Sequence, residues 1–278
     1  MKSKLTIALA QLAPEVGNTE TNLTRAIEAA DKAKAAGADI LMLPELHLQG
    51  YRADELFAEL AETIPGPSTD RLGEVAKKHN LHIVMGMGRR SEGFPDLCYN
   101  SLCFLGPEGV IGWYDKIHLG TFHPYIEGVY FAPGRSAPVF DTRFGKVALQ
   151  ICYDASFPEL TRLYAMRGAV LNLVISAGPS GDCEGWANTL RQRASENVMW
   201  TAYCNTVGKQ KDFSFFGGSK IVNPFGQIVA EAKFDEEDFL VATIDLEQSF
   251  HTRRHWMTFR DVQPWLLSEL AEASANAR

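Results

Sequence analysis

The sequence predicts an α/β fold in layers, with two sheets packed together and helices outside them. Three observations support this prediction. Short apolar segments alternate with longer segments of helical spacing. The helix–strand unit of the first half recurs in the second half. No Pro/Ser-rich linker or low-complexity stretch interrupts the chain, so we expect a single domain over residues 1–278.

The first half begins with buried strands separated by helices. The Ala-rich segment 20–36 has helical spacing, and Gly37 follows it as a stop signal. We expect strands at residues 5–11, 40–43 and 83–87, and helices at 20–36 and 68–79.

Further strands are expected from residue 100 onward, joined by turns such as 106–109. The expected strands are 100–105, 110–116, 147–151, 171–176, 201–206, 219–222, 227–232 and 240–244, with helices at 158–167 and 186–199. The tail from about His251 looks less regular. Its aromatic residues Trp256, Phe259 and Trp265 are expected to be exposed and to need a partner surface, which a second subunit would supply.

Composition excludes several classes of protein. The chain is 46% hydrophobic and 22% charged, with a net charge of −7 and interspersed signs, so nucleic acid is not an expected partner. The sequence contains no run of about 18 apolar residues, so no membrane span is expected. The N-terminus does not resemble a signal peptide. The five cysteines contain no CxxC pair, which argues against a disulfide framework or structural zinc and favours a reducing cytoplasm.

Cys152 is a candidate nucleophile because it ends an apolar strand just before a helix that begins near Pro158. A residue there stands on a sharp turn, as in the nucleophile elbow of serine hydrolases. Helical N–H groups nearby would lower the pKa of the thiol. The alternative is a buried core cysteine, the commonest state of a free cysteine.

Two further residues are candidates from local sequence. Glu45 follows a buried strand, where α/β folds place ligands, and a desolvated glutamate there could shuttle protons. Lys116 follows an alternating strand and could stabilise an oxyanion. The alternatives are a surface or capping carboxylate and a solvated lysine.

Together these residues lie in segments that resemble the Glu, Lys and Cys motifs of the nitrilase superfamily. The segments are "LPELHLQGY", "YDKIHL" and "ICYDASFPE", in the family's order and with similar spacing, and "FAPG" and "GGSKIVNPFGQIV" also match. The resemblance extends from Ile7 to about Leu246.

The resemblance implies roles for individual residues. Cys152 would be the nucleophile, Glu45 the general base and proton donor, and Lys116 the oxyanion stabiliser. Glu127 stands where the family has a second glutamate that orients the substrate. The N–H of Tyr153 could add an oxyanion donor, and Ala177 and Gly178 are expected to contact substrate. No metal or cofactor is required for this chemistry.

The resemblance also implies a four-layer α-β-β-α sandwich and at least a homodimer. The expected reaction is hydrolysis of a small carboxamide to the acid and ammonia through a thioester. Tyr153-Asp154 follow the nucleophile where nitrilases typically have Trp-Glu, which favours an amidase. Asp154 could also simply hold the turn by hydrogen bonds.

The substrate remains open at this point. Hydrolases of carbamoyl-D-amino acids carry arginines shortly after the nucleophile, whereas this chain has Ala155 and Ser156 there. Arg191 and Arg193 could clamp a carboxylate instead, and Asp182 and Glu184 could attract an amine. The alternatives are therefore a carbamoyl-amine or carbamoyl-amino-acid hydrolase, a nitrilase, or an interaction scaffold with a vestigial site. A dinucleotide-binding oxidoreductase is excluded because no GxGxxG follows the first strand.

Overall fold

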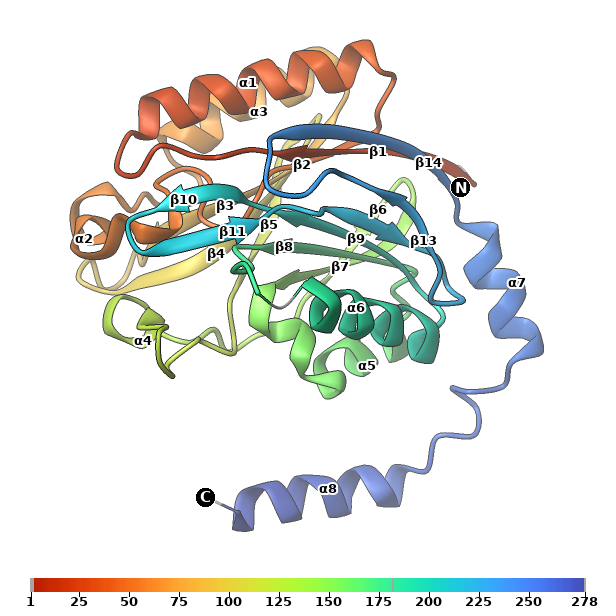
Figure 1. Cartoon of the computed structure of the whole chain (residues 1–278). Coiled ribbons are helices and arrows are strands. Elements are labelled where there is room, and N and C mark those ends of the chain that lie inside the picture. Colours follow the sequence, from red (N-terminus) through yellow and green to blue (C-terminus); the bar gives the residue numbers. More distant parts are fainter. Residues whose placement is uncertain (1–2, 182, 278) are drawn as a thin grey trace.

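The computed structural model describes residues 3–181 and 183–277 and shows two large sheets packed face to face (Figure 1). The first sheet has the order β14-β1-β2-β3-β4-β5, and the second has the order β13-β12-β9-β8-β7-β6. In the first sheet the strands are β1 (Lys4–Gln11), β2 (Ile40–Met42), β3 (His82–Arg90), β4 (Cys98–Gly106), β5 (Gly109–Asp115) and β14 (Asp238–Asp245). In the second they are β6 (Val139–Thr142), β7 (Gly145–Ile151), β8 (Leu171–Ser176), β9 (Trp200–Asn205), β12 (Lys220–Val222) and β13 (Ile228–Glu231).

Helices cover the outer faces of both sheets, α1 and α3 on the first and α5 and α6 on the second (Figure 1). The helices are α1 (Thr19–Ala35), α2 (Phe57–Leu60), α3 (Pro67–His79), α4 (Glu127–Tyr130), α5 (Pro158–Met166), α6 (Cys183–Asn197), α7 (Glu247–His255) and α8 (Pro264–Asn276). Two 3-10 helices, η1 (Tyr51–Leu56) and η2 (Cys152–Ser156), and a small hairpin of β10 (Val207–Gln210) and β11 (Phe213–Phe216) complete the chain. The predicted four-layer α-β-β-α sandwich is confirmed.

Burial on both sheet faces explains why the central strands are nearly continuous apolar runs. Along β1, Leu5, Ile7 and Leu9 join the core between the two sheets, whereas Ala8 and Ala10 join the core under α1 and α3. Successive side chains of a strand point to opposite faces, so apolar residues are needed on both faces of the strand. The same core between the sheets contains Val147, Leu149 and Ile151 of β7, which leads to Cys152.

The expected strands and helices are all present, with ends shifted by a few residues. The helix expected at 186–199 runs instead from Cys183 to Asn197. The hairpin β10–β11 and strand β6 were not predicted, because these strands have only four residues each and carry little periodic signal. No helix in the described part of the chain is long and apolar enough to cross a membrane.

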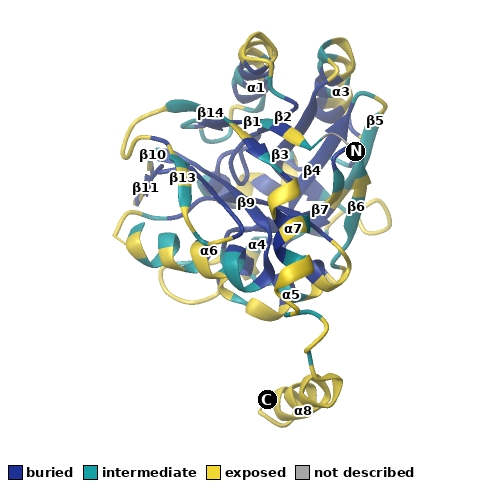
Figure 2. Cartoon of the chain, turned by 90° about the vertical axis from the view of Figure 1, so that its right-hand side faces the viewer, coloured by how far each residue is buried: buried dark blue, intermediate teal, exposed yellow. Residues whose placement is uncertain are grey.

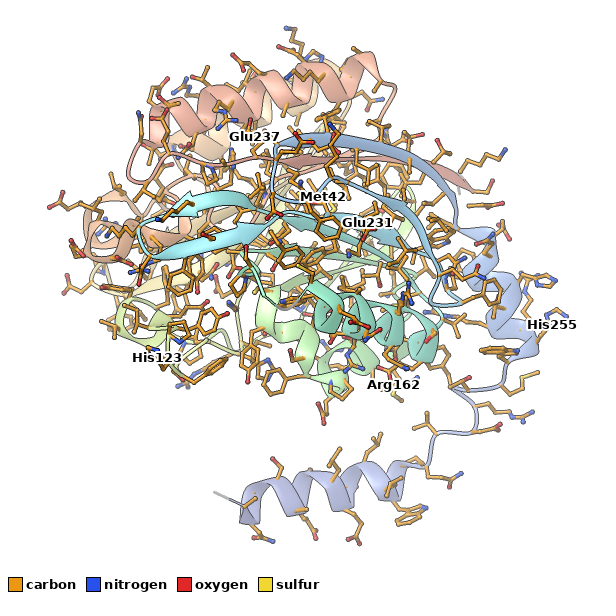
Figure 3. The ribbon with its side chains drawn as sticks, in the orientation of Figure 1. Met42, His123, Arg162, Glu231, Glu237 and His255 are labelled. Carbon is orange, nitrogen blue, oxygen red and sulfur yellow. The ribbon has the colours of Figure 1, made fainter. Side chains whose placement is uncertain are left out.

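The tail differs from expectation in two ways. It is largely helical rather than irregular, because α7 and α8 contain good helix formers and Pro264 occupies the first turn of α8. Phe259 is half-buried rather than exposed, because its ring packs between the guanidinium groups of Arg162 and Arg253, 5.5 and 4.9 Å from the ring centre. Figure 3 marks Arg162 on α5. Trp256 and Trp265 are exposed, as expected.

Candidate active site

Cys152 lies at the sharp turn between β7 and η2. Its φ of 47° falls in the left-handed region, which non-glycine residues rarely adopt and which stores backbone strain. The side chain of Asp154 holds this turn by accepting a hydrogen bond from the N–H of Ile151 at 3.2 Å. The predicted elbow at the end of the strand is therefore present, and Asp154 stabilises it as expected.

Asp154 also ties the cysteine turn to the segment that carries Lys116. Its carboxylate is fully buried and accepts hydrogen bonds from the Tyr114 hydroxyl at 2.7 Å and from the His118 N–H at 3.0 Å. The His118 ring, 2.9 Å from the same carboxylate, stacks on Phe157. The two segments therefore have a fixed relative position.

Glu45 lies three residues beyond β2 and is completely inaccessible to solvent. One carboxylate oxygen accepts hydrogen bonds from Asn100 Nδ2 at 2.7 Å and from Lys116 Nζ at 2.8 Å. The other accepts the N–H of Ala177 at 2.7 Å. Three partners from three separate parts of the chain therefore hold the carboxylate in one orientation.

Gly86 of β3 leaves the space that this geometry requires. A Cβ atom added there would lie 2.3 Å from the carbonyl oxygen of Pro44 and 2.7 Å from Glu45 Cα. Both atoms belong to the backbone and cannot rotate away, so only glycine fits beside the Glu45 segment.

Lys116 lies between two glutamates. Its ammonium is 2.8 Å from Glu45 and 2.7 Å from Glu127, and the side chain is 1% exposed. Glu127, at the start of α4, also accepts hydrogen bonds from the Tyr51 hydroxyl at 2.7 Å and the Gly120 N–H at 3.0 Å. The predicted site residues Glu45, Lys116 and Glu127 are therefore in direct contact.

Burial and neighbouring charges determine the protonation of these groups. Burial would lower the pKa of Lys116, but the carboxylates of Glu127 and Glu45 outweigh it and hold that pKa well above its ordinary value. Burial raises the pKa of Glu45, an effect that Lys116 opposes and Glu127 reinforces. Lys116 is therefore charged, and Glu45 has a greater affinity for protons than a solvated glutamate.

The expectation of a lowered thiol pKa is wrong. Burial raises the pKa of Cys152, Glu45 raises it further, and Lys116 only partly opposes them. The thiol lies among carboxylates, and helix α5 begins only at Pro158, too far along the chain for its N-terminus to dominate. Cys152 is consequently a neutral thiol in the free protein and needs a base to become a nucleophile.

Cys152, Lys116 and Glu127 line one pocket of about 260 Å³. Aromatic side chains form much of its wall. The complete lining is Lys116, Gly120, Phe122, Tyr125, Glu127, Cys152, Tyr153, Ser156, Pro179, Gly185, Trp186 and Thr189. Tyr153 lies in the first turn of η2, whose N–H groups have no partner within the helix.

Ala177 and Gly178 lie at this site but do not line the pocket. The N–H of Ala177 donates to Glu45, and that of Gly178 donates to Asn205 at 2.8 Å, so neither is free for a substrate. Pro179 forms the wall at this point. Asp182 lies outside the described residues, and Glu184 is exposed.

Sequence reasoning missed Asn100, Tyr51 and Gly86. Tyr51 stands in "LPELHLQGY". Asn100 stands in "YNSLCFLGPEGVIGWYDKIHL", the strand-turn-strand that leads to the Lys motif and also resembles the family, so these segments carried a signal for both residues. Gly86 stands in the apolar run of β3 and had no signal beyond being a glycine inside a strand.

A thiol, a buried ammonium and carboxylates around one pocket of an α/β sandwich are the chemical groups of a thiol-dependent hydrolase. The carbon–nitrogen hydrolase family model matches residues 6–254. The chain belongs to the carbon–nitrogen hydrolase family and is an enzyme.

Individual relatives agree with this family. A 2-oxoglutaramate amidase of Bacillus subtilis is 33% identical over 264 residues, which cover 94% of this chain and 98% of the relative. The crystal structure of a Saccharomyces cerevisiae member of branch 10 of the nitrilase superfamily aligns with a TM-score of 0.84 and 27% identity over 92% of this chain and 95% of that chain. A Glu→Gln mutant of an amidase from Nesterenkonia sp. AN1 aligns with a TM-score of 0.78 and 28% identity over 93% of this chain and 97% of that chain. That mutant carries the acetamide moiety of fluoroacetamide on its active-site cysteine.

Proposed function

We propose that the protein hydrolyses a small carboxamide to the carboxylic acid and ammonia, with a thioester on Cys152 as the intermediate. One observation carries the proposal: the Lys116 ammonium bridges Glu45 and Glu127 within 2.8 Å at a pocket that also holds Cys152. Amide hydrolysis by a thiol needs a base, an oxyanion donor and an acid for the leaving amine, and these groups can supply all three.

The first half of the reaction forms the thioester. Glu45 takes the proton of the Cys152 thiol, and the sulfur attacks the amide carbon. Lys116 and the N–H of Tyr153 stabilise the negative oxygen of the tetrahedral intermediate. The C–N bond then breaks, and Glu45 returns its proton to the departing nitrogen, which leaves as ammonia.

The second half releases the acid. Glu45 takes a proton from water, whose oxygen attacks the thioester carbon. The C–S bond breaks, the acid leaves, and the proton on Glu45 restores the Cys152 thiol. The raised pKa of Glu45 suits this alternation, because a group that both accepts and donates protons works best when its pKa approaches the working pH.

The decisive experiment compares two cysteine variants. Cys152→Ala should abolish ammonia release while preserving the fold, because it removes the nucleophile. Cys103→Ala makes the same change at a buried cysteine in the core under α1 and α3, and should retain activity. Measurable turnover by Cys152→Ala would overturn the proposal.

The substrate panel should separate the alternatives within the family. Ammonia release is measured with aliphatic amides, carbamoyl amines, carbamoyl amino acids and the matching nitriles. Amides are expected to react fastest, and mass spectrometry of the quenched enzyme should show an acyl group on Cys152. Preference for nitriles or carbamoyl compounds would contradict an amidase.

We also propose that the protein is at least a homodimer in which the tail contacts a second copy. Helix α8 is exposed along its length and has no buried residue (Figure 2). It nevertheless carries the exposed apolar residues Trp265, Leu266 and Leu270, and a large exposed apolar surface usually marks an interface. All five cysteines are unpaired, which supports the expected reducing, cytoplasmic environment.

A further inference from the structure

The wall of the Cys152 pocket is specialised for one kind of substrate. Resting on the function proposed above, we infer that the acyl group of the substrate is apolar and uncharged, and that amides bearing a carboxylate are rejected. The B. subtilis relative is named for 2-oxoglutaramate, an amide with a carboxylate, so the inference separates this chain from that relative.

Aromatic rings form the apolar part of the wall. Phe122 packs edge to face against Tyr125 and Tyr153, with ring centres 5.1 and 5.2 Å apart. Trp186 reaches the pocket from α6 and stacks on the buried Tyr203 at 5.7 Å. These mutual contacts restrict the rings before a substrate arrives, and an apolar group placed against the 48% exposed Phe122 would remove apolar surface from water with little reorganisation.

No lining residue offers a free positive charge among the residues that the structure describes. Lys116 is the only cation of the lining, and its ammonium already holds two carboxylates. Arg193 does not line the pocket: its guanidinium donates to the Ala155 carbonyl oxygen at 2.8 Å and pairs with Glu196. Arg191 is exposed and does not line the pocket either.

A substrate carboxylate would therefore lose its hydration without gaining a partner. It would also share the pocket with the carboxylate of Glu127, which repels it. Ser156 and Thr189 are the lining residues with hydroxyl groups outside the aromatic rings, and they are neutral. Neutral donors compensate poorly for the desolvation of an ion.

The size of the pocket favours a small substrate. Its volume of about 260 Å³ lies just below the range of roughly 300–1,000 Å³ that is typical of pockets for small-molecule ligands.

The test uses two amides of matched shape, 4-methylpentanamide and succinamate, in which a carboxylate replaces the isopropyl group. The full-length enzyme should have a kcat/KM about 100-fold or more higher for the neutral amide, because the buried carboxylate is unpaired. Comparable or higher kcat/KM for succinamate would overturn the inference and leave the proposed amidase function intact. Absence of turnover with every amide would instead overturn the proposed function.

A positive charge inserted into the pocket wall tests whether the lack of a free cation causes the expected selectivity against carboxylates. Thr189 lies one turn after Trp186 on α6 and lines the pocket. Thr189→Arg should raise the succinamate-to-4-methylpentanamide ratio of kcat/KM by about 10-fold or more, since it supplies the missing partner. Thr189→Met has a long side chain without charge and should leave that ratio near the wild-type value. An equal change in both variants would contradict the electrostatic explanation.

Discussion

The Cys152 pocket buries charged residues, whereas helix α8 exposes apolar residues. At the pocket, the charged side chains of Glu45 and Lys116 are 0% and 1% exposed. On α8, Trp265 is 63% exposed and Leu266 is 55% exposed. Figure 2 shows α8 as an exposed helix set apart from the buried body.

The difference shows how each region is stabilised. The buried charges are satisfied within the chain, because each has hydrogen-bond partners of opposite charge or polarity. The apolar residues of α8 have no cover within the described part of the chain. The charges at the pocket therefore have partners in the same copy, whereas the proposed dimer would provide the cover for the tail.

The largest effect should follow from removing the central buried charge. Lys116→Met leaves Glu45 and Glu127 facing each other without a cation, which should cost about 3–5 kcal/mol of stability. The variant should also lose about 10³-fold in kcat, because the oxyanion loses its donor. Chemical denaturation and ammonia release measure the two effects.

The pH dependence of Lys116→Met sharpens this test. Without the lysine, burial should hold the folded-state pKa of Glu45 further above its unfolded value, so stability is present at low pH and lost as pH rises through the folded value. The stability deficit should therefore shrink between pH 7.5 and 5.5. Lys220→Met is the control. Lys220 is equally buried, and its ammonium lies 2.7 Å from the carboxylate of Glu231, a pair that does not line the pocket. Figure 3 labels Glu231. It should retain activity.

A second prediction concerns a buried group of the body that stays neutral. His47 is fully buried, and burial lowers its pKa to about 4, below the ordinary histidine value of 6.5. Only the unfolded chain gains a proton as pH falls from 6.5 to 4, so stability should fall by about 3 kcal/mol over that window. His47→Gln should flatten this part of the curve, as measured by urea denaturation. An unchanged slope would show that other groups cause the acid sensitivity.

A smaller effect is expected for Glu127→Gln. Lys116 retains Glu45 but loses one of its two carboxylates, so kcat should fall by about 10²-fold with little change in stability. Glu231→Gln alters a lysine–glutamate pair of the same length outside the pocket and should leave kcat unchanged. Equal losses in the two variants would contradict a role for Glu127 in the reaction.

The smallest change in stability should follow from removing the tail. Deleting residues 262–278 should alter the stability of the body by less than about 1 kcal/mol, because α8 has no buried residue. Sedimentation should nevertheless show a loss of the dimer. Leu266→Glu with Leu270→Glu should act like the deletion, whereas Ser268→Glu adds charge to another face of α8. A dimer that survives the deletion would exclude α8 from the interface.

The sequence predicted the layered fold well because the core strands are buried on both faces. Runs such as residues 40–43 are apolar throughout, so their positions are visible without knowledge of tertiary structure. The short hairpin β10–β11 and the helical tail lack that signal. Glu45 and Cys152 each follow a mostly apolar run, whereas Lys116 follows an alternating strand. The resemblance of their three segments to the nitrilase motifs singled out all three residues together.

The partners of the site residues could not be predicted in the same way. Asn100 and Ala177 contact Glu45 across 55 and 132 residues of sequence, and only the packing of the two sheets brings them together. The thiol pKa of Cys152 was predicted in the wrong direction for the same reason. A nearby helix is visible in the sequence, whereas burial beside distant carboxylates is not.

Gly86 has a consequence for any attempt to transplant this chemistry. The Glu45 carboxylate occupies its place only because Gly86, on the neighbouring strand, has no Cβ atom. A designer who copied Glu45, Lys116, Glu127 and Cys152 onto a new scaffold, and placed alanine at the position of Gly86, would displace the Glu45 carboxylate from the Lys116 ammonium. Gly86 is therefore part of the site, although its side chain takes no part in the chemistry.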